Sequence, residues 1–87
     1  MNPELRNRLL RLDLDRVTYA LDPAQAVFLA CDLLVAGFDS PALCDLAGES
    51  PTRLEANDAD WLIRRMLVEL GLKPMTFEEA EQLLDGG

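Results

Sequence analysis

Apolar residues along this chain fall into blocks bounded by residues that begin or end helices. The block over residues 22–37 begins with Asp-Pro and ends with Gly, and the block over residues 40–48 begins with Ser-Pro and also ends with Gly. Nearer the C-terminus, Thr76 and Glu79 form a capping box. Capping side chains, proline in the first turn and glycine after the last turn satisfy the backbone groups that helix ends leave unpaired. The pattern therefore predicts short helices joined by tight turns.

Five helices are predicted from these helix-starting and helix-ending residues and from the helical spacing of the apolar residues. The first begins at Asn2 and Pro3 and continues to about Tyr19, and the alternative is a break near residues 13–15. We favour the single helix. Its apolar residues form two stripes on opposite sides, which are Leu5, Leu9 and Leu12 on one side and Leu10, Leu14, Val17 and Leu21 on the other. The remaining helices are expected over residues 23–36, 41–47, 56–70 and from 76 onward.

The helix over residues 23–36 is the most apolar of the five. After its first residue only Gln25 and Asp32 are polar, and they share one narrow face. A helix that is apolar nearly all round is buried nearly all round. We therefore expect it at the centre, enclosed by its neighbours or, where they leave it open, by a second copy of the chain. The other helices are expected to contribute Leu43, Cys44 and Leu46, then Ala59, Leu62, Ile63, Met66 and Leu70, and finally Phe77, Ala80, Leu83 and Leu84.

The fourth predicted helix has two alternative starts. Either Asn57 or Asp58 caps it, or Thr52 and Glu55 form a capping box one turn earlier. Gly71 is expected to end it.

Length and composition fit one small helical domain over residues 1–87. Hydrophobic residues make up 49% of the chain, which is enough for a packed core, and aromatic residues make up only 6%. A core built mainly from Leu, Ala and Val suits helices, and no strand pattern or repeat is visible. The predicted fold is all-α, a compact bundle of four to five short helices.

The charge balance restricts the classes of partner. Eight basic and sixteen acidic residues give a net charge of −8, which repels nucleic-acid phosphates and anionic membranes. It favours a basic protein partner, or it serves only to keep a small protein soluble. The longest apolar stretch, residues 26–36, is interrupted by Asp32 and is too short to span a bilayer. The first sixteen residues hold four arginines, so the first helix is expected to dock on the acidic remainder or on a second copy.

Cysteine usage indicates a reducing compartment and no metal. The two cysteines, Cys31 and Cys44, form no CxxC pair, and the chain contains no histidine. A structural zinc site needs about four nitrogen or sulfur ligands, which one chain does not supply. Both cysteines lie in apolar helical patterns, where we expect small buried side chains. No secretory leader pattern is visible, so the expected location is the cytoplasm, and no cofactor is predicted.

The fourth predicted helix carries the one candidate interaction surface. At about 100° per residue, Trp61 and Val68 fall opposite its core stripe, beside Arg64 and Arg65. Exposed Trp and Arg are typical of the residues that dominate binding energy at protein interfaces. Arg65 is also spaced to stack over the Trp61 ring. The alternative is that another helix covers this face and that Trp61 belongs to the core.

Ser40 has a second interpretation besides helix capping. Residues 37–40, in a small acidic helical chain, look like the serine attachment motif of acyl or peptidyl carrier proteins, in which the serine carries phosphopantetheine. The chain departs from that motif because Pro41 stands where leucine is expected. It also departs because residues 23–36 form a helix where carrier proteins have a long loop.

A wider resemblance covers roughly residues 24–72. Residues 37–43 (GFDSPAL), 46–48 (LAG) and 69–72 (ELGL) resemble small all-helical proteins of actinobacterial type that show a GxDSPALxxLAG…ELGL pattern. The resemblance implies a helical fold and no assigned activity. Some proteins of this type are neighbours or immunity partners of secreted toxins, so it also implies an interaction role.

Together these features favour a non-catalytic protein-interaction module, immunity- or adaptor-like, with Trp61, Arg64, Arg65 and Val68 as its surface. No catalytic site is predicted, because histidine and a glycine-rich phosphate loop are missing and the carboxylates are scattered. Two alternatives remain, a carrier protein modified at Ser40 and a purely structural homodimer.

Overall fold

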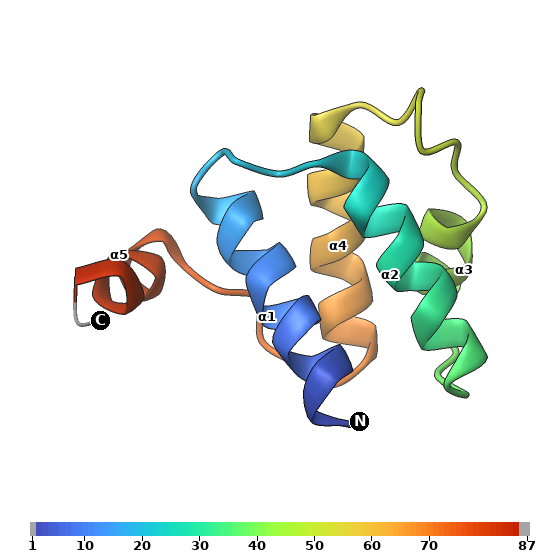
Figure 1. Ribbon diagram of the computed structural model, residues 1–87, viewed down its shortest axis with the longest axis horizontal. Coiled ribbons are helices and arrows are strands. Elements are labelled where there is room, and N and C mark those ends of the chain that lie inside the picture. Colours follow the sequence, from blue (N-terminus) through green and yellow to red (C-terminus); the bar gives the residue numbers. More distant parts are fainter. Residues whose placement is uncertain (1, 86–87) are drawn as a thin grey trace.

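Helices supply the regular structure of residues 2–85, which are the residues that this computed structural model describes (Figure 1). No strand occurs within this range. The radius of gyration is 12.2 Å, close to the value expected for a compact domain of this length. The prediction of a compact all-α fold is confirmed. In chain order the helices are α1 (Pro3–Val17), α2 (Pro23–Val35), α3 (Pro41–Ala47), α4 (Ala56–Glu69) and α5 (Phe77–Asp85).

Four helix starts follow the predicted capping chemistry. The Asn2 side chain accepts the N–H of Leu5 at 2.8 Å, and Asp22 and Ser40 cap α2 and α3 in the same way. Proline occupies the first turn of all three helices. At α5 the Thr76 hydroxyl accepts the N–H of Glu79 at 3.2 Å, as the capping box requires. Local side chains therefore set where these helices begin.

The start of α4 differs from both predicted alternatives. The helix begins at Ala56, and Glu55 holds the N-cap position without a side-chain hydrogen bond. Asn57 and Asp58 lie inside the first turn rather than ahead of it. The predicted caps are wrong because the helix is placed by its packing rather than by a capping side chain, and its apolar stripe begins at Ala59.

The first helix is continuous from Pro3 to Val17, and the alternative break near residues 13–15 does not occur. It ends two residues short of the expected end. Tyr19 adopts the left-handed conformation, with φ of 60°, and its side chain is 93% exposed. This residue turns the chain towards α2 where a glycine is the usual choice.

The core lies where α2, α3 and α4 meet, and α1 covers one of its sides through Leu5, Leu9 and Leu12. The short helix α3 packs between α2 and α4. Arg8 of α1 binds Asp32 of α2 at 2.7 Å, which confirms that the basic first helix docks on the rest of the domain. The largest fully buried side chains are Leu33, Leu43, Leu46, Ile63 and Met66.

One face of α2 is open, and the prediction that this helix is buried nearly all round is wrong. Val35 is 89% exposed and Phe28 is 50% exposed, whereas Leu33 is fully buried. The reason is geometric, because the buried residues of α2, at which α1, α3 and α4 pack, fall on one half of the helix at about 100° per residue: Ala26, Val27, Leu29, Ala30 and Leu33. None of the described helices is both long and apolar enough to cross a membrane.

Both cysteines are exposed and neither forms a disulfide, so the prediction of buried thiols is wrong. Cys31 lies on the open face of α2, where its thiol is 3.8 Å from the carbonyl oxygen of Ala47. Cys44 donates its S–H to the Asp39 carboxylate at 3.4 Å. This hydrogen bond raises the pKa of the Cys44 thiol above its ordinary value and keeps it protonated.

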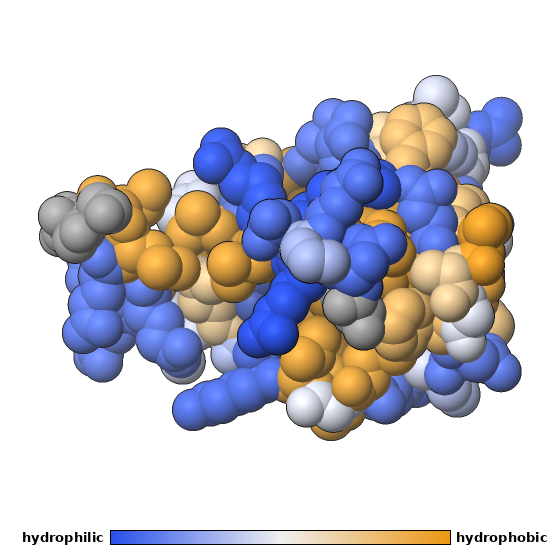
Figure 2. Space-filling view, turned by 60° about the horizontal axis from the view of Figure 1, so that its bottom comes forward, coloured by the Kyte–Doolittle hydropathy of each residue, from blue (hydrophilic) through white to orange (hydrophobic). Residues whose placement is uncertain are grey.

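The last helix packs on α1 and projects from the side of the domain away from α2 and α3 (Figure 1). Only Ala80 of its predicted inward face is buried, and Phe77, Leu83 and Leu84 are between 50% and 62% exposed. The second stripe of α1 is likewise covered in part, with Leu10 half-exposed. Figure 2 shows hydrophobic atoms gathered over α5 and the adjoining part of the molecule. The predicted burial of these three side chains is wrong because a single helix, α1, provides the surface under α5.

Candidate functional site

The exposed side of α4 brings together the four residues predicted as an interaction surface, which we call the Trp61 surface: Trp61, Arg64, Arg65 and Val68. Trp61 is 51% exposed and Val68 is 63% exposed. The opposite side of α4 supplies Ile63 and Met66 to the core. Trp61 is not part of the hydrophobic core cluster, so this tryptophan lies outside the core.

The Arg65 guanidinium stacks over the Trp61 ring. The guanidinium carbon lies 4.8 Å from the ring centroid, within the range of a cation–π contact. The same guanidinium donates to a Glu69 carboxylate oxygen at 3.4 Å, one turn further along α4. An aromatic ring stacked on a held guanidinium loses little conformational freedom when a partner docks against it.

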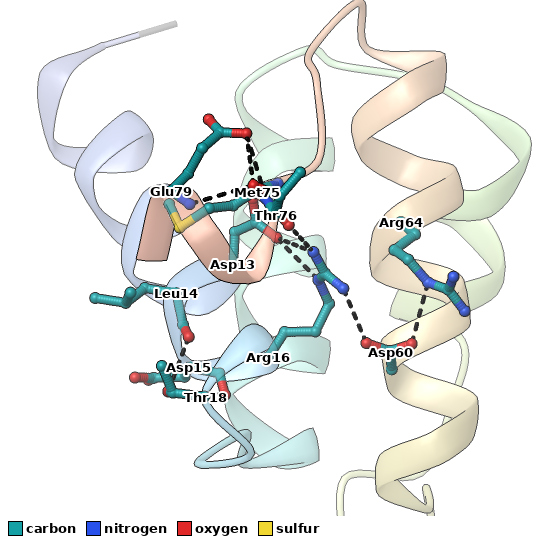
Figure 3. A network of polar contacts seen from close by, with 10 residues as sticks. All are labelled: Asp13, Leu14, Asp15, Arg16, Thr18, Asp60, Arg64, Met75, Thr76 and Glu79. Carbon is teal, nitrogen blue, oxygen red and sulfur yellow. Dashed lines mark hydrogen bonds and ion pairs between the residues drawn. The ribbon is translucent and has the colours of Figure 1, made fainter. Parts of the chain in front are cut away.

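Arg64 is held through a chain of ion pairs that leads into the protein (Figure 3). Its Nε lies 3.1 Å from one carboxylate oxygen of Asp60, and the other oxygen of Asp60 is 3.1 Å from Nη1 of Arg16. The Arg16 side chain is only 8% exposed, so a buried charge on α1 sets the position of a surface arginine on α4.

The buried end of this chain is a cluster that the sequence analysis missed. Asp13 binds Arg16 at 2.9 Å with one carboxylate oxygen and accepts the Met75 N–H at 2.8 Å with the other. Arg16 also donates to the Met75 carbonyl at 3.0 Å. The cluster ties the segment before α5 to α1 and, through Asp60, to α4 (Figure 3). A usable signal was present, because Asp13 and Arg16 are in helical phase with the Leu9 stripe.

Glu69 lies at the edge of the Trp61 surface and joins it to α3. Its Oε1 accepts the N–H of Ala42 at 2.8 Å, a donor in the first turn of α3. This hydrogen bond lowers the pKa of the Glu69 carboxyl, and smaller lowering contributions come from Ser40 and Arg65, against a raising effect of desolvation. The carboxylate is therefore the form that the folded protein favours.

Glu69→Gln is expected to lower stability at neutral pH, because the Ala42 donor and Arg65 then face a neutral amide. A carboxyl with a lowered pKa in the folded state stabilises above its unfolded pKa, and this contribution disappears as the pH falls through the folded pKa. The difference in melting temperature between wild type and variant should therefore shrink as the pH falls below the ordinary range of a glutamate. Thermal unfolding across a pH series measures it, and a difference that is constant with pH would contradict the assignment.

Two hollows flank Trp61, and they differ in charge. One, of about 320 Å³, is lined by Arg64, Arg65 and Val68 together with Trp61 and Glu69. The other, of about 310 Å³, is lined by Trp61, Leu62 and three carboxylates, namely Asp45, Glu49 and Asp58. None of the ion pairs among residues 2–85 involves these three carboxylates. Trp61 thus separates a hollow bordered by arginine from an acidic one.

Ser40, the residue on which the carrier alternative depends, is 6% exposed. Its Oγ accepts the N–H of Leu43 at 3.1 Å and so caps α3. A serine in this position is not presented to a modifying enzyme, and its side chain already has a structural role. The placement argues against modification at Ser40.

A further hollow, of about 440 Å³, lies between the end of α1 and the starts of α4 and α5. Its polar lining includes Arg16 and Asp60, which already bind each other. Within residues 2–85 no group of three or more potential metal ligands comes together. The two charged side chains of this hollow are therefore engaged with each other and are not available to a ligand.

Comparison with protein-family models, curated proteins and solved structures finds no match to this chain.

Proposed function

We propose that this protein is a non-catalytic, immunity- or adaptor-like interaction module that binds a protein partner through the Trp61 surface. The observation that carries the proposal is a half-exposed tryptophan, 51% accessible, with a guanidinium stacked on its ring. A large, rigid aromatic side chain on a stable helix gains much from being covered and loses little entropy in the process.

The charges around Trp61 favour a basic partner. Asp45, Glu49 and Asp58 border the acidic hollow beside the ring, and the chain as a whole carries a net charge of −8. A lysine or arginine of the partner would enter this hollow while an apolar side chain covers Trp61 and Val68. The long-range field would also speed the encounter with a basic protein, an effect that salt weakens.

The proposal includes a reducing cytoplasm as the place of action. Both thiols are exposed and unpaired, and such thiols persist where the redox poise keeps them reduced. The same negative charge disfavours nucleic acid and anionic membranes as partners.

Trp61→Ala is expected to weaken partner binding about 30-fold, because a central aromatic residue contributes about 2 kcal/mol or more at such interfaces. Its melting temperature should stay within about 2 °C of wild type, since half of the ring is already in water. The partner is first captured from the native cell and identified by mass spectrometry. The purified pair is then titrated by calorimetry, because Trp61 is the only tryptophan of the chain and its emission is lost in the variant.

Phe77→Ala is the matched control, because Phe77 is also aromatic and 56% exposed but lies on α5. Its affinity for the partner should equal that of wild type. The proposal fails if Trp61→Ala lowers the melting temperature strongly and leaves binding intact, or if both variants lose affinity equally.

A further inference from the structure

The open face of α2 carries an apolar stripe that the described residues leave largely exposed, although the Cys31 thiol within it lies 3.8 Å from the carbonyl oxygen of Ala47. Phe28 is 50% exposed, Val35 is 89% exposed, and Cys31 between them is exposed as well, with half-buried Ala24 one turn earlier. At about 100° per residue the four side chains fall within an arc of about 60°. Hydrophobic atoms are visible at the right-hand side of Figure 2, where α2 and α3 lie. The stripe is thus narrow and straight, like the seam between two paired helices.

The spacing of this stripe is the same when it is read in either direction, with steps of 4, 3 and 4 residues. When a second α2 lies antiparallel across the first, Phe28 of one copy meets Cys31 of the other, and Ala24 meets Val35. Each contact joins a larger side chain to a smaller one, which lets the two helices approach closely. Antiparallel helices also align their dipoles favourably.

The charges beside the stripe are complementary under the same symmetry. A hollow of about 320 Å³ between α1 and α2 is lined in part by Arg8, Arg11 and Asp15. Arg8 binds Asp32 at 2.7 Å and Arg11 binds Asp15 at 3.2 Å, so two positive and two negative charges balance here. A two-fold axis perpendicular to α2 places the hollow of one chain beside the same hollow of the second chain, with the lining residues in the opposite order. The arginine end of one copy then faces the Asp15 end of the other.

We infer that α2 is the contact helix of a symmetric homodimer, in which two copies pair antiparallel through Ala24, Phe28, Cys31 and Val35. The chain carries a net charge of −8, but the four charged side chains on the α1 side of the stripe balance one another. On that side two acidic copies therefore meet without bringing net charge together. The dimer face lies on α2 and the Trp61 surface on α4, so the two are separate.

Cross-linking tests the register directly. In the antiparallel arrangement residue 24 of one copy is opposite residue 35 of the other, whereas the two copies of residue 24 are about 16 Å apart along the helix axes, beyond disulfide reach. With Cys31→Ser and Cys44→Ser as the background, the added changes Ala24→Cys and Val35→Cys together are expected to give a covalent dimer on mild oxidation, and either change alone should stay monomeric in denaturing gels. Efficient cross-linking of a variant with only one added cysteine would indicate parallel helices and overturn the inference.

Sedimentation equilibrium tests the dimer in the unmodified chain. Native protein should associate reversibly, and Phe28→Glu should shift the association at least about 30-fold towards monomer with an unchanged circular dichroism spectrum. Val35→Glu should do the same, which protects the test against one poorly folded variant. A native chain that stays monomeric up to about 1 mM overturns the inference.

Val68→Glu separates this inference from the proposed function, because Val68 is 63% exposed and belongs to the Trp61 surface. It should weaken partner binding and leave the dimer intact, and Phe28→Glu should do the reverse. If Val68→Glu alone abolishes self-association, the dimer uses α4 and the assignment to α2 is wrong.

Discussion

Asp13→Ala is expected to destabilise the protein by about 3 kcal/mol, the usual effect of removing one partner from a buried ion pair. The Arg16 side chain is 8% exposed and would keep its charge with Asp60 as its remaining carboxylate partner. The Met75 N–H would also lose its acceptor, which now lies 2.8 Å away. For a domain of this size the loss corresponds to a fall of about 15 °C in melting temperature.

Urea unfolding measures the global effect, and the exchange rate of the Met75 amide hydrogen measures the local one. Asp45→Ala is the control, because this carboxylate is exposed on a helix, and it should change stability by no more than about 0.5 kcal/mol. The combined change Asp13→Leu with Arg16→Met should recover part of the loss, since it removes both buried charges. An Asp13→Ala variant as stable as wild type would show that the cluster contributes nothing.

Leu43→Ala is expected to cost a similar amount, about 3 kcal/mol, for a different reason. Leu43 is 0% exposed and belongs to α3, a helix of 7 residues that packs between α2 and α4. The neighbouring helices are held by other contacts and do not close over the void, so the cavity adds to the lost burial. The total stability of 87 residues is roughly 4–13 kcal/mol, so either variant removes a large fraction of it.

The matched control for Leu43→Ala is Leu84→Ala, the same substitution at a helical position that is 62% exposed. It should change the free energy of unfolding by no more than about 0.5 kcal/mol in chemical denaturation. Equal losses at both positions would mean that the assigned core is wrong.

The starts of four helices were predictable because they depend on local chemistry. Asn2, Asp22, Ser40 and Thr76 begin four helices because each side chain satisfies a backbone N–H within three residues of itself. Such contacts depend on neighbouring residues only and can be derived from sequence. The start of α4 was not predictable in this way, because Glu55 makes no capping bond and packing places the helix.

Burial was harder to predict, because it depends on how many neighbours a helix has. The apolar composition of α2 indicates that it can be buried, but Phe28, Cys31 and Val35 are exposed because its neighbours occupy one half of its surface. The same reasoning applies to the apolar face of α5, which meets α1.

The Trp61 surface depends on local spacing along one helix, whereas the buried cluster depends on contacts between distant parts of the chain. Trp61, Arg64, Arg65 and Val68 share one face of one helix, so periodicity alone brought them together. The contact between Asp13 and Met75 joins separate parts of the chain, and no spacing rule connects them. The one signal in the sequence was that Asp13 lies on the same face of the first helix as Leu9, which indicated that a charge would be buried.

The hydrogen bond from Met75 to Asp13 closes a separation of 62 residues, whereas α1 to α4 follow one another through short turns. Closing so long a loop costs chain entropy, so we expect α5 to dock after the α1–α4 unit has passed its transition state for folding. Changes at Asp13 would then act mainly on the rate of unfolding. The buried cluster would thereby set how long a folded molecule persists rather than how quickly it forms.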